Sequence, residues 1–260
     1  QVPPEGAPQV PPEGAPQVPP EGAPQVPPEG AMLVLPVSGI GEVDTSTDLA
    51  AVIAEAAQLR DGDVVVVTQK IVSKAEGRMV EIDPGDPEAK RALVERESVR
   101  ILRRRGELIV SETQHGFVCA NAGIDLSNVP EGRAALLPVD ADRSARRIRR
   151  RLRAIAGVDV AVIVSDTFGR AWRRGVVDVA IGCDGVAAIV DLRGTFDANG
   201  RELVATEMCI ADEIASAAEL VMGKDRGLPV AIVRGIDPTW ARRSSVADEI
   251  IRPPGEDLFR

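Results

Sequence analysis

Aromatic residues are scarce in this chain, which has no tyrosine, two tryptophans, four phenylalanines and one histidine among its 260 residues. Proteins that bind single-stranded nucleic acid rely on stacking aromatics and a basic groove. This chain instead carries a net charge of −9 and has a pI near 4.9. We therefore expect no nucleic-acid partner. The lone histidine, His115, is more typical of a structural residue than of a general base.

Cysteines are also few, and Cys119, Cys183 and Cys209 form no C-x-x-C pair. An odd number of isolated cysteines argues against disulfides and zinc, and is typical of reduced thiols in the cytoplasm. No apolar run approaches the roughly 20 residues that span a bilayer, and no charged-then-apolar leader is present. We expect a cytoplasmic protein with no membrane partner.

The common nucleotide-binding fingerprints are missing. The chain has no G-x-x-x-x-G-K-[ST] phosphate loop, and Gly39-Ile-Gly41 is followed by Glu42, so it does not match the dinucleotide pattern either. The residues alone therefore indicate no nucleotide site.

Residues 1–31 are three copies and a truncated fourth copy of the octapeptide Gln-Val-Pro-Pro-Glu-Gly-Ala-Pro. They hold eleven of the 20 prolines and no lysine or arginine. Such a segment buries too little surface to offset its ordering entropy, so we expect a disordered tail. Met32 is a candidate start of translation, and residues 32–260 suit one large domain or two modest lobes.

Strand-like and helical patterns alternate through residues 32–260, which predicts α/β architecture. Two strand runs without a helix between them, near 176–190, favour a mixed sheet over a uniformly parallel one. A turn is expected at Asp197–Gly200. The expected strands are 32–37, 64–68, 108–111, 134–137, 158–164, 176–181, 187–190 and 230–233. The expected helices are 48–59, 87–105, 143–156 and 206–221.

Two acidic positions stand out as metal-ligand candidates. Asp166 follows the apolar run 158–164, so its carboxylate should emerge at a strand tip. Asp125 lies in a polar loop that also contains Asn128. Carboxylate, amide and hydroxyl oxygens are the ligands that Mg²⁺ and Mn²⁺ prefer. A capping aspartate and an Asx-turn asparagine are the structural alternatives.

Arginines that could bind anions follow closely, at Arg170, Arg173 and Arg174. They could equally be solvated surface charges. A further cluster, Arg143–Arg153, has seven arginines in eleven residues; it could face solvent or a second subunit, or it could attract an anionic substrate.

Several motifs together resemble the coenzyme F420-0:L-glutamate ligase family, in the correct order and over about Leu33 to Phe259. The matching segments are Val72–Arg78 (VSKAEGR), Asn121–Val129 (NAGIDLSNV), Ser165–Arg170 (SDTFGR), Arg173–Gly175 (RRG) and Ala211–Ala215 (ADEIA).

The resemblance implies a GTP-dependent, GDP-forming ligase that adds L-glutamate to the terminal carboxylate of coenzyme F420-0, or its dehydro form, through an acyl phosphate. It implies two divalent ions, Mg²⁺ or Mn²⁺, and allows K⁺ as a further cation. The implied fold is a mixed-sheet, two-lobed α/β homodimer with intertwined subunits. Some members continue into a flavin-dependent reductase domain, which begins about where this chain stops, so no flavin is expected.

The resemblance also assigns residues. Asp125 and Asp166 would hold the first ion, and Thr167 would contribute to the second. Lys74 matches a phosphate-contacting lysine; its structural alternative is a surface cation. The remaining positions implied to contact the nucleotide are Ile40, Gly41, Glu42, Val43, Gln69, Lys70 and Asn128. At positions 40–43, 69 and 70 the side chains differ from common members, so backbone contacts matter more there.

One departure from the family pattern concerns the loop after the last predicted helix. Several members carry a glutamate there that helps to bind the second metal, whereas this chain has Lys224. Three readings follow: Asp225 substitutes, Lys224 contacts phosphate, or the second ion is held more weakly. The alternative functions are a related ligase with another carboxylate acceptor, and a nucleotide-binding regulator without catalysis.

Overall fold

The computed structural model describes residues 30–83 and 85–257, and the fold belongs to the unit Met32–Arg260. The predicted disordered repeat, apart from Gly30 and Ala31, lies outside the described residues. Within the described part of the chain, no helix combines the length and the apolar character needed to cross a membrane.

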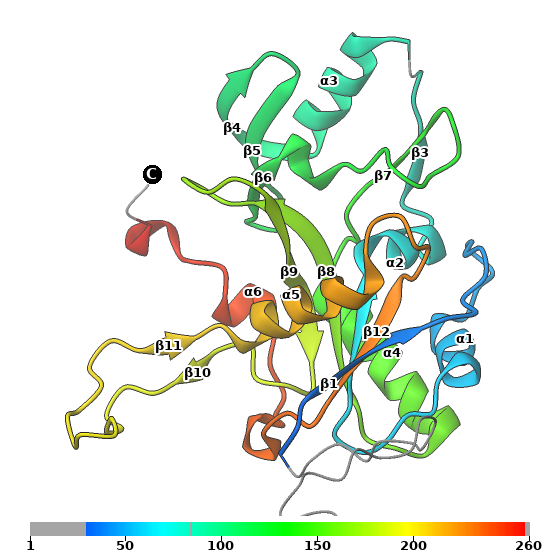
Figure 1. Ribbon diagram of the computed structural model, residues 1–260. Helices are drawn as coiled ribbons and strands as arrows, with labels where there is room; N and C mark the ends of the chain where they lie inside the picture. Colours follow the sequence, from blue (N-terminus) through cyan, green and yellow to red (C-terminus); the bar gives the residue numbers. More distant parts are fainter. Residues whose placement is uncertain (1–29, 84, 258–260) are drawn as a thin grey trace, which may run out of the picture. The chain divides into compact units, whose positions relative to one another are not determined.

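A five-stranded mixed sheet forms the centre of the unit (Figure 1). Its strands, in spatial order, are β1 (Leu33–Val37), β12 (Val230–Arg234), β2 (Val64–Thr68), β8 (Ala161–Gly169) and β9 (Val176–Asp184). Strands β2 and β8 are parallel, and the other neighbours are antiparallel. The prediction of a mixed α/β sheet is confirmed.

Helices cover both faces of this sheet (Figure 1). Helix α5 (Ile210–Met222) packs on one face, and α1 (Leu49–Ala56) and α4 (Ala141–Ala156) pack on the other. Coverage on both faces explains why all four valines of β2 are fully buried, as is usual for strands in parallel pairs. Helix α4 approaches β9 so closely that a Cβ on Gly182 would lie 2.2 Å from the carbonyl carbon of Ala141.

Smaller elements surround the central sheet. Strands β4 (Ser98–Arg105), β5 (Leu108–Thr113) and β6 (Val118–Ala120) form a three-stranded sheet. Two-stranded sheets join β3 (Met79–Glu81) to β7 (Arg133–Ala135), and β10 (Val190–Asp191) to β11 (Glu207–Met208). The remaining helices are α2 (Gln69–Ala75), α3 (Pro87–Arg96), α6 (Val246–Glu249) and the 3-10 turns η1 (Asn121–Gly123), η2 (Pro238–Trp240) and η3 (Pro254–Glu256).

The predicted helix over 87–105 is wrong in its second half. Helix α3 ends at Arg96, where the backbone N–H of Glu97 bonds back to Leu93, and strand β4 begins at Ser98. Pairing of β4 with β5 across the turn at Gly106, where φ is +57°, outweighs the helix propensity of the arginines. The predicted strand at 187–190 is also wrong, because only Val190 belongs to a strand. The turn at Asp197–Gly200 is confirmed by the hydrogen bond from Gly200 N to Asp197 O.

The β8–β9 hairpin positions the candidate site. Strand β9 is an edge strand, and helix side chains satisfy its outward N–H groups: Glu219 Oε2 accepts from Asp178 at 3.1 Å, and Asp212 Oδ1 accepts from Ala180 at 2.9 Å. Carboxylates of α5 therefore protect this edge from further strand pairing. Burial of Asp212 raises its pKa, although its bond from Ala180 opposes the shift.

Candidate functional site

The β8–β9 hairpin presents polar side chains on two opposite faces. Side chains alternate along a strand, so Ser165 and Thr167 share one face while Asp166 and Phe168 point to the other. A register shift between Val164 and Ser165 lies directly before these residues. Such bulges commonly re-aim side chains next to functional positions.

Asp166 does not lie at a strand tip, as the sequence suggested, because β8 continues to Gly169. It instead lies one residue beyond Ser165, the last position of β8 that pairs with β2. The carboxylate of Asp166 therefore emerges beside the carboxyl end of β2, and β8 extends beyond the end of β2, its parallel neighbour.

The surroundings of Asp166 disfavour its negative charge. Burial is the main reason that its pKa rises to about 7, and the charges of Asp125 and Asp178 push in the same direction. The backbone N–H of Thr167 and the charge of Lys224 oppose the shift only in part. Asp166 also contributes, after burial, to a pKa of about 12 for the neighbouring Cys119 thiol. A cation bound here would relieve this electrostatic cost.

Asp125 approaches Asp166 from a different segment, just after η1. Its backbone N–H and carbonyl both bond to Ala135, which fixes the loop against β7. Its carboxylate accepts from Lys70 Nζ at 2.9 Å and from Ser127 N at 2.7 Å. Burial alone would raise the pKa of Asp125, but these bonds outweigh burial and lower it. The structure thus brings together two of the predicted metal ligands.

Asn128 connects this loop to the one after α5. It adopts a positive φ of +51°, which asparagine tolerates better than most residues. Its Nδ2 donates to the carbonyl oxygen of Lys224 at 3.3 Å. Loops separated by 96 positions in the sequence therefore meet beside the hairpin.

The predicted phosphate contact Lys74 lies on α2 and forms an ion pair with Glu42, with 3.1 Å between Nζ and Oε2. The glutamate side chain is 93% exposed, whereas the lysine side chain is 13% exposed. Ile40 packs against the hydrophobic core and Val43 is buried, so the loop between them is held at both ends while Gly41 and Glu42 face solvent.

The side chain of Gln69 has a structural role. The residue is 1% exposed, and Nε2 donates to the carbonyl oxygen of Leu136 at 3.0 Å and to Ser73 Oγ at 2.9 Å. The side-chain amide of Gln69 is therefore occupied by bonds within the fold, and its contact with a nucleotide stays a prediction.

The opposite face of the hairpin holds a second polar group, built around Asp178. Its carboxylate accepts from Ser165 Oγ at 3.0 Å, from Thr167 Oγ1 at 2.7 Å and from Lys224 Nζ at 2.8 Å. Lys224 Nζ also contacts Thr167 Oγ1 and lies 2.8 Å from Glu219 Oε1. Burial opposes the charge of Lys224, but the bonds and charges of Asp178 and Glu219 outweigh it and raise its pKa. We call Thr167, Asp178, Glu219 and Lys224 the lysine cluster.

Comparison with known proteins identifies the family. The sequence model described as F420-0:Gamma-glutamyl ligase matches residues 39–235. A coenzyme F420:L-glutamate ligase of Methanopyrus kandleri is 46% identical over 242 residues, which covers 86% of this chain and 96% of the relative. The proteins with the same name from Methanothermobacter thermautotrophicus and Archaeoglobus fulgidus are 42% and 41% identical; each covers 87% of this chain, and 98% and 96% of the relative. The chain belongs to the F420-0:gamma-glutamyl ligase family.

The family implies a divalent metal, and the structure allows a test of fit. Asp125 and Asp166 supply oxygen ligands from converging segments, and their mutual repulsion favours a cation between them. No group of three or more His, Cys, Asp or Glu side chains is arranged to hold a metal among the residues that the structure describes. Mg²⁺ and Mn²⁺ commonly use one or two carboxylates and complete their shell with waters and phosphates, so the carboxylates of Asp125 and Asp166 are the part of the site that suits them.

Sequence reasoning missed Asp178 and Glu219. Asp178 interrupts the apolar run Val176–Ile181 and is 1% exposed. An aspartate inside an apolar strand is a signal for a buried polar partner, since buried charges are almost always paired. Nothing in the spacing points to Glu219, which reaches the site only because α5 packs along β9.

The two groups of arginines that the sequence singled out differ in their surroundings. Arg170, Arg173 and Arg174 lie in the exposed turn between β8 and β9. On α4, Arg147 pairs with Glu76 at 2.7 Å, and Arg149 pairs with Asp184 at 3.0 Å. At least part of the α4 cluster therefore makes internal ion pairs.

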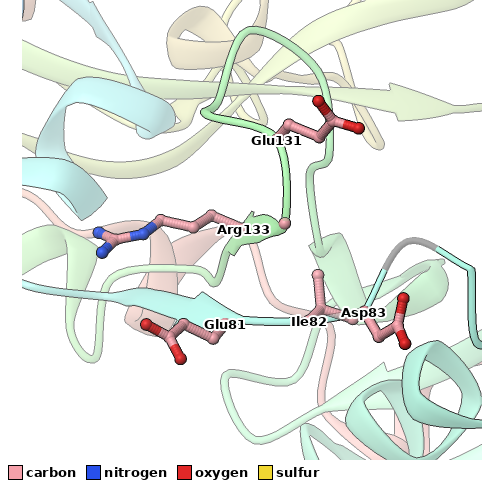
Figure 2. Close-up of a pocket in the computed structure, with 6 residues that line it drawn as sticks. Glu81, Ile82, Asp83, Glu131 and Arg133 are labelled. Atoms are coloured by element: carbon pink, nitrogen blue, oxygen red, sulfur yellow. The ribbon is translucent and has the colours of Figure 1, made fainter.

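A pocket of about 430 Å³ lies against β3 and β7 (Figure 2). The carboxylates of Asp83 and Glu131 lie toward one end, and Glu81 and the guanidinium of Arg133 extend toward the other. Its described lining residues include none of those predicted for the family site. A smaller pocket of about 240 Å³ is lined by the two edge-to-face aromatics Phe117 and Phe168, among others.

Proposed function

We propose that this chain is a GTP-dependent ligase that joins L-glutamate to the terminal carboxylate of coenzyme F420-0, or of its dehydro form, and releases GDP and phosphate. The observation that carries the proposal is family membership across nearly the whole length of relatives named coenzyme F420:L-glutamate ligase. The convergence of Asp125 and Asp166 supports it, because Mg²⁺ in phosphoryl-transfer sites is commonly bound by one or two carboxylates together with the substrate phosphates.

The chemistry requires activation of a carboxylate. A carboxylate does not react with an amine at neutral pH because its leaving group is poor. Transfer of the γ-phosphoryl group of GTP to a carboxylate oxygen would give an acyl phosphate and GDP. The glutamate amine would then attack the carbonyl carbon, forming the C–N bond as the C–O bond to phosphate breaks and the amine loses a proton.

The chain's own residues have positioning roles in this proposal, since protein catalysis of phosphoryl transfer is largely positioning and charge neutralisation. Asp125 and Asp166 would hold a Mg²⁺ or Mn²⁺ ion, which supplies charge neutralisation at the phosphates. Lys70 keeps the Asp125 carboxylate ionised and oriented. Lys74 would exchange its exposed partner Glu42 for a phosphate oxygen, and Asn128 and the loop Ile40–Val43 would line the nucleotide.

We extend the proposal to an intertwined homodimer in the cytoplasm. A long arm that contains β10 and β11 projects from the central sheet (Figure 1), and it exposes two apolar side chains, Phe196 and Val204. Exposed apolar groups on a projecting arm favour contact with a second copy of the chain. Light scattering of the purified protein would measure the mass: a strictly monomeric protein would contradict this part.

The activity is tested with purified protein, F420-0, L-glutamate, GTP and Mn²⁺ or Mg²⁺. We expect a coenzyme product heavier by one or more glutamyl residues, by mass spectrometry, and one GDP for each amide formed. GDP formed only with a different carboxylate acceptor would favour the related-ligase alternative. Nucleotide binding without GDP formation in the presence of both acceptors would favour a regulator instead.

A further inference from the structure

We propose that the ammonium group of Lys224 permanently occupies the place of the second cation, so that this chain binds one divalent ion with its nucleotide where the family pattern implies two. The inference rests on the proposed function and revises its metal content. It makes Lys224 a positioning residue that is specific to chains with a lysine here.

The contacts of Lys224 are those of a bound cation. Its Nζ contacts Thr167 Oγ1, lies 2.8 Å from Asp178 Oδ1 and lies 2.8 Å from Glu219 Oε1. Three oxygens thus surround one charged nitrogen that has three N–H donors. One of these oxygens belongs to Thr167, the residue that the family pattern assigns to the second ion.

Burial makes this arrangement stable. The Asp178 side chain is 2% exposed, so its carboxylate depends on Lys224 and not on water, whereas the side chains of Glu219 and Lys224 are 21% and 54% exposed. Removing the partner of a buried charge is strongly destabilising, because the charge that remains is left uncompensated. A divalent ion that entered the cluster would have to displace Lys224, and the displaced ammonium would then lie beside a second, stronger positive charge.

The loop is also fixed from its other side. Asn128 Nδ2 donates to the carbonyl oxygen of Lys224, so the loop of Asp125 and the loop of Lys224 hold each other. The first ion position, at Asp125 and Asp166, and the lysine cluster therefore lie on opposite faces of one hairpin and are joined through Asn128.

The test counts bound Mn²⁺ per chain, by equilibrium dialysis with electron paramagnetic resonance, in the presence of a non-hydrolysable GTP analogue. We expect one ion in the natural protein. Lys224→Gln and Lys224→Glu should raise the count to two, because Asp178 and Glu219 then lack their cation. Lys224→Arg, which keeps the charge, should stay at one, and Lys90→Gln on α3 controls for loss of a lysine elsewhere.

Two ions in the natural protein, or one ion in well-folded Lys224→Gln and Lys224→Glu, would overturn the inference. Circular dichroism establishes that each variant is folded. If Lys224→Glu does not fold, the ion count of Lys224→Gln alone decides the test. The two proposals fail differently. A chain that makes glutamylated product and carries two ions rejects only the inference, whereas a chain that binds no nucleotide and makes no product rejects the function as well.

Discussion

Two aspartates on one hairpin, Asp166 of β8 and Asp178 of β9, have opposite electrostatic surroundings. Asp178 accepts from Ser165, Thr167 and Lys224 on the face toward α5. Asp166 faces the other side, and burial together with the charges of Asp125 and Asp178 raises its pKa to about 7. Three donors of the protein stabilise the charge of Asp178, whereas the surroundings of Asp166 disfavour its charge.

The difference separates a structural acid from a functional one. Asp178 is buried among partners from the chain itself, so its charge contributes to folding. A carboxylate whose charge is disfavoured binds a cation more strongly, because the cation relieves the cost. The position with the perturbed pKa is therefore the better candidate for the metal.

The largest expected effect follows from removing the charge at Asp166. We expect Asp166→Asn to lower the ligase turnover by about 1,000-fold, since charge stabilisation by a metal contributes several kcal/mol and each tenfold costs about 1.4 kcal/mol. Steady-state GDP release measures this loss. Near-normal rates at saturating Mn²⁺ would contradict the role of Asp166 as a metal ligand.

The same residue should make the metal-free protein sensitive to pH. Its pKa is about 7 in the folded chain against an ordinary value of 3.8, so the folded state holds a proton that the unfolded state has released between these values. Stability should therefore fall by up to a few kcal/mol as pH rises from about 4 to about 7. Urea unfolding in EDTA measures this trend, and Asp166→Asn is the control that should lack it. A fall of equal size in the variant would assign the effect to other groups.

The sequence predicted the elements that depend on local pattern. The valines of β2 form a continuous apolar run, and the arginine-rich segment of α4 carries its buried residues at helical spacing; both elements form where expected. The second half of the predicted helix 87–105 failed because its partner, β5, is a tertiary contact that periodicity does not reveal. The same reason explains why α2 was missed: Gln69–Ala75 is short and is held by side-chain bonds from Gln69 and Ser73 to Leu136.

The residues of the candidate site likewise fall into those that the sequence pattern reveals and those that only tertiary packing brings together. Asp166 could be found as a polar residue after an apolar run and Asp125 as an acid in a polar loop with Asn128, both strengthened by the family resemblance. The sequence marked Lys224 as a departure and left three readings open. Only the packing of α5 along β9 brings Glu219 and Asp178 to that lysine, and no spacing rule encodes it.

The contribution of the Asp178 charge to stability is tested with Asp178→Asn. The amide keeps one acceptor oxygen for Thr167, but it loses the charge that holds Lys224 and gives Ser165 a weaker partner. We expect a loss of about 2–3 kcal/mol in the free energy of unfolding, somewhat below the usual cost of breaking a buried ion pair. Urea denaturation at pH 7 measures it. A loss below about 0.5 kcal/mol would mean that the cluster contributes little to folding and would remove the contrast with Asp166.

The smallest effect is expected at Glu219, the partially exposed member of the lysine cluster. In Glu219→Gln the amide oxygen can still accept from Asp178 N, so only the ion pair with Lys224 is lost. Because the Lys224 side chain is 54% exposed, solvent screens this pair, and we expect a loss of about 0.5–1 kcal/mol. The contribution should shrink in 1 M salt, whereas the effect of Asp178→Asn should persist, since buried charges are screened less. Equal salt sensitivity of the two variants would show that Asp178 is no better shielded than Glu219, and the distinction between a buried anchor and an exposed partner would fail.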